Sequence, residues 1–227
     1  MKFTVNRPAF CEALKTVTNV GKSSLLTRIS GIYLYADASK RILELIGTDV
    51  ITSVVKRIRD ADISMSGEIL LPPIVLEILR KTKEESVTIE TDENGALGLS
   101  FGSARYLLVT KPANEFPKSE LVFPTAYVSV SGLLPLLKHA AFAAETKGDK
   151  RELQGVTLRL TPGISTAEAM NQKRMASAVN RNAADGETEM KLHISAVNIL
   201  FSLLSADKTV YAGIADQRAV FVCGDTV

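Results

Sequence analysis

The chain has 227 residues, of which 46% are hydrophobic and 23% are charged, and its formal net charge at pH 7 is +2. This composition is typical of a globular protein, and no apolar run approaches the roughly 18 residues that a membrane-spanning helix needs. The small net charge argues against a protein that holds nucleic acid through a large excess of positive charge. Any contacts to DNA would therefore be few and local.

The N-terminal third predicts a strand, a helix and further strands. Residues 2–5 alternate in polarity, which is typical of a strand and unlike a signal sequence. Residues 10–17 carry apolar side chains at helical spacing, and residues 31–34 predict the next strand. A second apolar helical pattern opens at Leu70, runs to Leu79 and ends in a polar break.

Three strands are predicted after the second helical pattern. The first two lie at residues 86–90 and 97–101, joined by a turn at residues 92–95. A further strand at residues 105–109 leads into residues 111–124, a stretch with prolines and polar residues that has the composition of a linker between domains.

The second half repeats the first at an offset of about 123 residues, falling to about 122 near the end. The repeat predicts strands at residues 127–130, 155–158, 209–213 and 219–223, and helices over residues 133–143 and 193–204. A turn at residues 215–218 joins the last two strands, and Gly224 closes the pattern as Gly102 does in the first copy. A repeat of this length indicates a duplicated domain rather than a solenoid unit.

The predicted fold is therefore α+β, with two tandem domains that each pack two helices on antiparallel sheet. We expect the first domain at residues 1–120 and the second at residues 125–227. The second copy shows no counterpart of the strand at residues 105–109. We therefore expect an incomplete second domain with its last strand absent, in a chain that is either a fragment of something longer or has its open sheet edge covered by a partner.

No catalytic, metal or cofactor site is predicted. The tripeptide that begins at Gly21 resembles the end of a phosphate-binding loop, but position 16 is Thr16 where the motif needs glycine, and the segment follows a helix. His139 and His193 lie in different predicted domains, without cysteine or carboxylate at metal spacing and without a nucleophile beside them. The paired carboxylates fall in turns, where Asp and Glu are common.

Cysteine usage favours a reducing compartment. Cys11 and Cys223 sit inside apolar stretches of different predicted domains, so we interpret both as reduced, buried small hydrophobic residues. This suggests a cytoplasmic protein.

Basic residues recur at equivalent places in the two copies. In or around the first helix of each copy lie Arg7, Lys15, Lys22 and Arg28, and Lys138, Lys147, Lys150 and Arg151. Two interpretations remain open: an ordinary solvated helical face, or a basic surface that follows a phosphate backbone. The absence of Trp and the scarcity of other aromatic residues disfavour a platform for stacking single-stranded bases.

Several segments resemble, in order and spacing, the bacterial DNA polymerase III β subunit, the sliding clamp. They lie at residues 1–5, 31–34, 45–49, 71–79, 112–117 and 153–156. The resemblance covers the whole chain and corresponds to the first domain and most of the second of a three-domain subunit. It implies tandem DNA-clamp domains and a ring of six such domains, made by a head-to-tail dimer, with helices lining the hole around duplex DNA.

The resemblance implies a non-enzymatic processivity factor in DNA replication that tethers the polymerase to double-stranded DNA. A closed ring needs no tight grip because its topology prevents escape, and weak phosphate contacts that do not read the bases permit sliding. By position in the family, the DNA-contacting residues are Lys22, Lys150 and Arg151. Lys15 and Lys138 are added from their placement on helices alone.

The resemblance also implies half of an apolar pocket for short peptides of polymerase and clamp-loader subunits. Its residues are Leu153, Met170, Lys173, Arg174 and Met175. The family has Thr where this chain has Met170, and His where it has Lys173, so the peptide specificity of the family is in doubt here. Simple core packing is the alternative role for Leu153 and Met175.

A second function stays possible: a clamp-derived interaction module that binds peptides without encircling DNA. The assembly is open as well. Six domains at two per chain would give a trimer, and the incomplete second copy equally allows a monomer or an irregular dimer.

Overall fold

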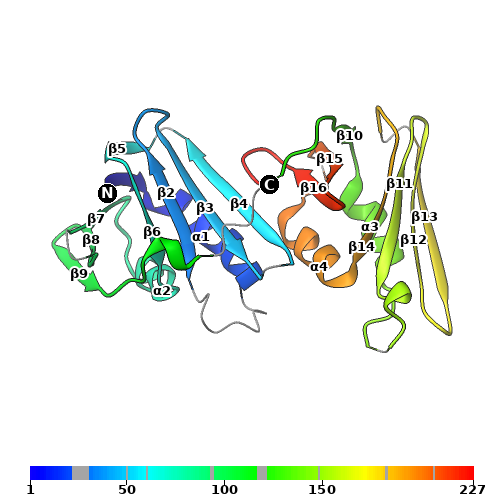
Figure 1. Ribbon diagram of the computed structural model, residues 1–227, viewed down its shortest axis with the longest axis horizontal. Helices are drawn as coiled ribbons and strands as arrows, with labels where there is room; N and C mark the ends of the chain where they lie inside the picture. The colour runs from blue at the N-terminus through cyan, green and yellow to red at the C-terminus, as the bar shows by residue number, and fades with distance from the viewer. Residues whose placement is uncertain are drawn as a thin grey trace. The chain divides into compact units, whose positions relative to one another are not determined.

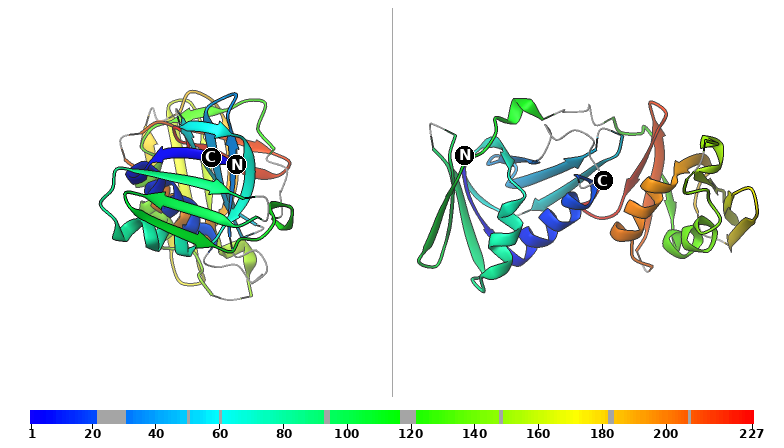
Figure 2. Two further views of the ribbon diagram at one scale, coloured as in Figure 1. Left: turned by 90° about the vertical axis from the view of Figure 1, so that its left-hand side faces the viewer. Right: turned by 90° about the horizontal axis from the view of Figure 1, so that it is seen from below.

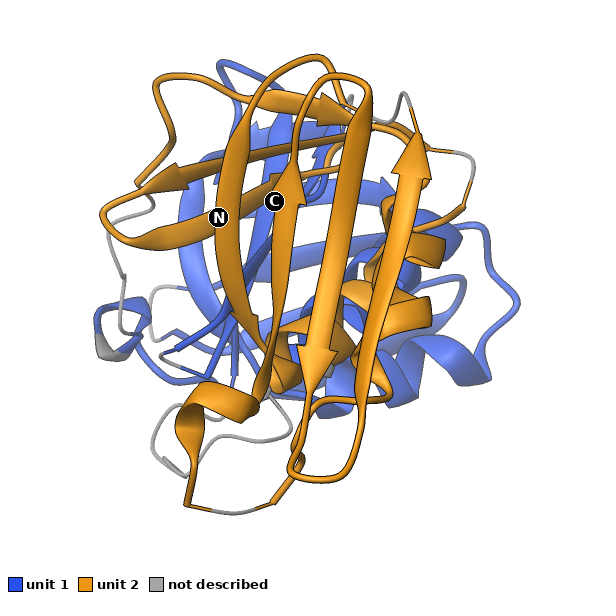
Figure 3. Ribbon diagram, turned by 90° about the vertical axis from the view of Figure 1, so that its right-hand side faces the viewer, with its two compact units in different colours: residues 1–119, 226 blue, residues 120–225, 227 orange. Residues whose placement is uncertain are grey.

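The computed structural model describes residues 1–21, 31–49, 51–59, 61–92, 95–116, 122–147, 149–181, 184–206 and 208–227. Over these ranges the chain forms two compact units, one of Met1–Ser119 with Thr226 and one of Glu120–Asp225 with Val227 (Figure 3). In the part of the chain so described, each unit contains two α-helices and two antiparallel sheets.

The first unit combines a five-stranded and a four-stranded sheet (Figures 1 and 2). The larger sheet has the order β5-β1-β7-β8-β9, with β1 (Lys2–Asn6), β5 (Asp62–Met65), β7 (Ser86–Thr91), β8 (Leu97–Phe101) and β9 (Ala104–Leu108). The smaller sheet has the order β4-β3-β2-β6, with β2 (Ile32–Asp37), β3 (Ile42–Thr48), β4 (Ser53–Arg59) and β6 (Gly67–Leu71).

Helix α1 (Arg7–Gly21) packs along β3 and β4, on one face of the smaller sheet (Figure 2). The apolar side chains that recur at helical spacing are fully buried: Phe10, Ala13, Leu14, Val17 and Val20. A Cβ at Gly47 of β3 would lie 2.2 Å from the Val17 carbonyl oxygen, so this close approach of helix to strand requires glycine. Helix α2 (Ile74–Lys81) packs against α1, and its Val75, Leu76 and Leu79 are buried.

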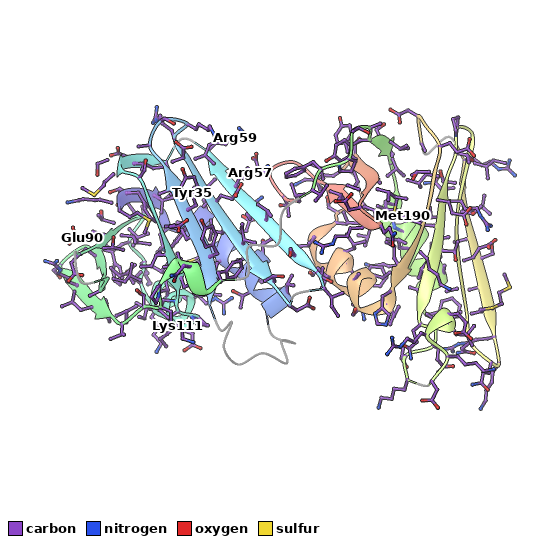
Figure 4. The ribbon with its side chains drawn as sticks, in the orientation of Figure 1. Tyr35, Arg57, Arg59, Glu90, Lys111 and Met190 are labelled. Atoms are coloured by element: carbon purple, nitrogen blue, oxygen red, sulfur yellow. The ribbon has the colours of Figure 1, made fainter. Side chains whose placement is uncertain are left out.

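The opposite face of the smaller sheet is more polar. Tyr35, Glu44 and Arg57 lie side by side on neighbouring strands, and the Arg57 guanidinium pairs with the Glu44 carboxylate at 2.8 Å (Figure 4 labels Tyr35 and Arg57). Glu44 alternates with the buried Leu43 and Leu45. This alternation is the pattern of a strand with one face on a core and one toward solvent.

The second unit combines a four-stranded and a three-stranded sheet. The first has the order β13-β12-β11-β14, with β11 (Gly155–Leu160), β12 (Ile164–Met170), β13 (Met175–Arg181) and β14 (Thr188–His193). The second has the order β10-β15-β16, with β10 (Val128–Val130), β15 (Val210–Ala215) and β16 (Arg218–Val222). A short 3₁₀ turn, η3 (Arg151–Leu153), directly precedes β11.

Helices α3 (Leu133–Ala141) and α4 (Ile194–Leu203) cover one face of the four-stranded sheet and pack against each other (Figure 3). On β12 and β13, the sheet offers α3 small side chains: Ser165, Ala167, Ala169 and Ala178. Small residues let a helix approach the strands closely. Larger side chains, including Leu158, Leu160 and Met190, fill the rest of this core (Figure 4 labels Met190).

The beginning of the predicted linker belongs to the first unit. A 3₁₀ turn, η2 (Ala113–Glu115), follows Lys111, which forms a β-bridge with Leu70. The Phe116 ring stacks on Tyr33 with centroids 5.4 Å apart. Residues up to Phe116 are therefore held by packing, and a linker could begin only beyond them.

The helices and strands predicted from the sequence and the turn at residues 215–218 are confirmed with small shifts at their ends, with one exception. Two residues of the turn predicted at residues 92–95, Glu93 and Asn94, lie outside the described residues. The pattern that opens at Leu70 was expected to be helical, but residues 67–71 form strand β6 and the helix begins only at Ile74. Pro72 and Pro73 separate the two elements, because proline cannot donate to a strand ladder and is tolerated at a helix start. The expectation of a helical start at Leu70 was wrong.

The repeat is visible in the backbone of the two closing hairpins. Gly102 ends β8 with φ of 54°, and Gly224 follows β16 with φ of 57°, at the equivalent place. The two-residue turn between β15 and β16 has Asp216 at φ 45° and Gln217 at φ 62°. Positive φ at both central residues is the geometry of a type I′ hairpin turn.

Candidate functional site

The helices of the first unit expose cations at several positions. Lys15, one of the candidate DNA contacts named from the sequence, is exposed on α1. The last turn of α2 adds exposed Arg80 and Lys81, which were not among the predicted site residues. Glu12 and Glu77 are exposed on the same helices, so this surface has mixed charge with a modest excess of cations. Lys22 and Arg28 lie outside the described residues.

Arg7 does not belong to this cationic surface. Its guanidinium donates to the carbonyl oxygens of Glu84 at 2.5 Å and Leu79 at 3.3 Å, which ties the start of α1 to the end of α2. A cation that satisfies the last carbonyls of a helix has a structural role. The sequence alone could not separate this role from that of Lys15, because both side chains lie on the same helix.

In the second unit the cations are on α3 and in the loop before β11. Lys138 is exposed on α3, and Lys150 and Arg151 are exposed in the loop that forms η3. Helix α4 carries no charged side chain at all. The predicted DNA contacts of this unit therefore depend on one helix and one loop, and not on both helices.

The structure gathers the predicted peptide-pocket residues at one end of the four-stranded sheet. Met170 and Met175 are direct cross-strand partners at the end of the β12–β13 hairpin. Val156 pairs with Ala169, so the start of β11 lies beside the end of β12. Half-buried Leu153 in η3, which directly precedes β11, lies at this same end. Met170 and Met175 are 43% and 60% exposed, so core packing does not account for them.

Arg174 has a defined anchor at the end of α3. Its Nη2 donates to the Phe142 carbonyl oxygen at 2.6 Å, and its guanidinium carbon lies 5.5 Å from the centre of the Phe142 ring. This geometry combines a charge-assisted hydrogen bond with a cation–π contact. Phe142, 60% exposed, was missed by sequence reasoning. An aromatic residue that interrupts the alanines at the end of α3 was the available signal.

The start of α4 lies at this same end of the sheet. His193 pairs with Gly155 across β14 and β11, and its Nδ1 accepts a hydrogen bond from the Ser195 backbone N–H at 3.2 Å. The Ser195 hydroxyl lies 2.8 Å from the same nitrogen, and the Gln154 amide oxygen lies 3.4 Å from Nε2. His193 thus caps the start of α4.

Two further groups show environments that shift their pKa. Hydrogen bonds from the side chain and the backbone N–H of Ser129, the latter at 2.7 Å, hold the pKa of the Asp185 carboxyl below its usual range. Burial raises the pKa of the Cys11 thiol, and the nearby Arg7 charge lowers it by less. Cys11 and Cys223 are both free thiols as expected, although each is half-buried rather than fully buried.

Among the described residues, no group of three or more His, Cys, Asp or Glu side chains could hold a metal ion. No described helix is both long enough and apolar enough to span a bilayer.

Two units of the same build, each with two helices packed on antiparallel sheet, define the class of α+β proteins with tandem clamp-type domains. The family profile described as "DNA polymerase III beta subunit, N-terminal domain" matches residues 1–120, which is more than half of the chain. The chain belongs to this family.

Curated relatives and solved structures agree with this assignment. The chain is 29% identical over 180 residues to the beta sliding clamp of Pseudomonas aeruginosa and 31% identical over 160 residues to that of Synechococcus elongatus. These matches cover 78% and 69% of this chain but only 48% and 42% of the relatives, so the chain spans less than half of the relatives it matches.

The solved sliding clamps of Bacillus subtilis and Caulobacter crescentus superpose on the whole chain with TM-scores of 0.91 and 0.88. Their identities to this chain are 19% and 24%, and the match covers 63% and 64% of their lengths. At this level of identity the structural likeness establishes the fold.

Proposed function

We propose that the chain acts as part of a sliding clamp, a processivity factor that encircles duplex DNA and tethers the replicative polymerase. The observation that carries this proposal is the pair of equivalent units, each with two helices packed on antiparallel sheet, in a chain that belongs to the DNA polymerase III β-subunit family. The division into clamp domains at residues 1–120 and 125–227 is part of the same proposal.

The proposed DNA contact is made by exposed cations that touch phosphates and read no bases. Lys15, Lys138, Lys150 and Arg151 are all exposed and supply this chemistry, and Lys22 joins them by its position in the family. Contacts of this kind lose little free energy as the protein moves from one phosphate to the next, so they permit sliding along the duplex.

The proposed partner contact is at the end of the β12–β13 hairpin. Exposed Met170 and Met175, with Leu153 beside them, provide an adaptable apolar surface for short peptides of the polymerase and of clamp-loader subunits. Lys173 and Arg174 in the hairpin turn add positive charge. In this function the protein has no catalytic step, requires no cofactor and works in the cytoplasm.

Ring formation requires association between chains, and strand β9 supports it. β9 is an edge of its sheet, with Leu107 72% exposed and Val109, just beyond it, 92% exposed. An edge strand with exposed apolar side chains is a typical surface for pairing with another chain. We therefore include a homo-oligomer in the proposed function.

Retention on circular DNA tests the proposal. The chain is incubated with a bacterial clamp loader, ATP and a nicked circular plasmid, and gel filtration measures how much protein co-elutes with the DNA. We expect retention that is lost when the plasmid is cut with a restriction enzyme. Equal retention on circular and cut DNA would contradict encirclement, and peptide binding without retention would identify an interaction module instead.

A further inference from the structure

We propose that Lys173 makes the hairpin surface of the second unit selective for peptides that carry a carboxylate next to an apolar anchor. This inference rests on the proposed function, since it assigns the chemistry of the peptide that docks at the same surface. The surface is made of Met170, Met175 and Lys173, and we call it the hairpin surface.

The apolar part of the hairpin surface is open to a ligand. Met170 and Met175 face the same side of the hairpin because they are direct cross-strand partners. This side is opposite to α3, since Ala169 and Ala178 on the same two strands turn their side chains into the core. Two flexible thioether side chains that lie together outside a core can adapt to one apolar side chain of a partner.

The turn between the two methionines holds Lys173 in place at its backbone. The Asn171 side-chain oxygen accepts hydrogen bonds from the backbone N–H groups of Lys173 at 2.9 Å and Arg174 at 3.0 Å. The Asn171 backbone N–H donates to the Arg174 carbonyl oxygen at 2.9 Å. The turn is therefore well defined, and the exposed Lys173 side chain starts two residues from Met175.

The two cations of the turn differ in their availability. The Arg174 guanidinium is engaged with Phe142 through its hydrogen bond and its ring contact. Lys173 makes no ion pair or side-chain hydrogen bond with any residue that the structure describes. Lys173 is therefore the cation of the turn that can pair with a carboxylate of the ligand.

The surroundings of the hairpin surface favour an acidic ligand. Glu168, the nearest carboxylate along β12 on the same face, lies 3.4 Å from the Arg159 guanidinium and is thus already paired. At this end of the unit the cations outnumber the carboxylates: Lys147, Lys150, Arg151, Lys173 and Arg174 against Glu145, Asp149 and Glu152. A local excess of positive charge steers an acidic peptide toward the surface and fixes its orientation.

The test uses two synthetic peptides that differ only in charge. Fluorescein-labelled Ser-Leu-Glu-Phe-Gly and its Ser-Leu-Gln-Phe-Gly twin are titrated with the full chain, and fluorescence anisotropy measures both dissociation constants. An exposed ion pair changes an affinity by about two- to five-fold at low salt, so we expect the Glu peptide to bind more tightly by this factor. The preference should fall as salt is raised.

Variants then assign the preference to Lys173. Lys173→Gln should bind both peptides equally, and Lys173→Glu should favour the Gln peptide. Lys191→Gln, which removes an exposed lysine from β14 at the other edge of the sheet, is the matched control and should keep the preference. Met175→Ser should weaken both peptides alike, because it removes apolar surface.

The outcomes separate this inference from the proposed function. If both peptides bind equally to the unchanged protein and both depend on Met175, the carboxylate preference is wrong while docking at the hairpin surface stands. If neither peptide binds, peptide docking at this surface is wrong, and the preference falls with it. A preference that survives in Lys173→Gln would overturn the role of Lys173.

Discussion

Residues that look alike in the sequence have different contacts in the structure. Arg7 and Lys15 lie on one helix, but Arg7 satisfies carbonyl groups at the end of α2 whereas Lys15 is exposed. Arg174 and Lys173 are neighbours in one turn, but the Arg174 guanidinium contacts Phe142, whereas the Lys173 side chain makes no hydrogen bond or ion pair with the residues that the structure describes. At this scale the chemistry depends on contacts between residues far apart in sequence, which composition and spacing do not reveal.

The polar side chain of Ser165 lies in the core, where it lowers the stability of the folded protein. It is fully buried on β12, and its hydroxyl has no hydrogen-bond partner among the described residues. Because an unpaired buried hydroxyl loses its hydrogen bonds to water, we expect Ser165→Ala to increase the free energy of unfolding by about 1 kcal/mol. Urea denaturation followed by circular dichroism measures the change. The exposed Ser177→Ala is the control, expected to change stability by less than about 0.5 kcal/mol.

The lowered pKa of Asp185 predicts how the stability of the protein depends on pH. Its pKa is lowered in the folded protein by hydrogen bonds from Ser129, so its contribution is fully present above the ordinary Asp pKa of about 3.9. The contribution is lost as pH falls through the lower pKa of the folded state. Asp185→Asn keeps an oxygen acceptor but no charge, so the difference in melting temperature between the two proteins should be constant above about pH 5 and shrink below it. Melting curves that stay parallel to pH 3 would contradict this role.

At the scale of helices and strands, strong apolar periodicity was sufficient for prediction and weak periodicity was not. Helix α1 was predictable because large apolar side chains recur every three or four residues. Strand β12 was not placed individually, because Ser165, Ala167 and Ala169 occupy its buried positions and give almost no hydrophobic signal. The need for small residues there arises from the close approach of α3, which is a property of the fold.

The residues of the candidate peptide site also differ in whether the sequence could predict them. The end of the hairpin that holds Met170 and Met175 could be identified through the family resemblance, and the structure shows both side chains exposed. Phe142 could not, since its contact with Arg174 joins residues 32 positions apart. The roles of all these residues in binding remain predictions.

The hairpin of β15 and β16 offers a test at the level of one element. Gln217 has φ of 62° in the type I′ turn, a conformation that costs a non-glycine residue roughly 1–2 kcal/mol. Gln217→Gly should therefore stabilise the protein by about 0.5–1 kcal/mol, measured as a higher melting temperature. Gln217→Ala should show no such gain, because alanine meets the same steric clash. Equal stabilisation by both substitutions would rule out backbone strain as the cause.

At the scale of the whole molecule, the small net charge of +2 and the uncharged helix α4 predict few phosphate contacts in the proposed complex with DNA. Each phosphate contact contributes to the dependence of DNA affinity on salt, so a protein with few contacts should show a shallow dependence. Affinity measured at several salt concentrations on a short duplex gives this slope directly.

Substitution of Lys150 and Arg151 tests whether these two residues contribute to the salt dependence of DNA affinity. The double substitution Lys150→Gln and Arg151→Gln should reduce the salt slope by about 2, one for each phosphate contact removed. Lys208→Gln, which changes an exposed lysine between α4 and β15, should leave the slope unchanged. An unaltered slope in the double variant would show that these two residues do not touch phosphates.

The Arg174–Phe142 contact has a mechanical meaning within the second unit. Phe142 directly follows the helix that presents Lys138, and Arg174 belongs to the loop that presents Lys173. The Arg174 guanidinium thus links the end of α3 to the turn of the candidate docking hairpin, in addition to the core packing of α3 on β12 and β13. A peptide bound at the hairpin would therefore lie one side-chain contact away from the end of α3, so substitution of Phe142 or Arg174 would remove a direct connection between the two candidate surfaces.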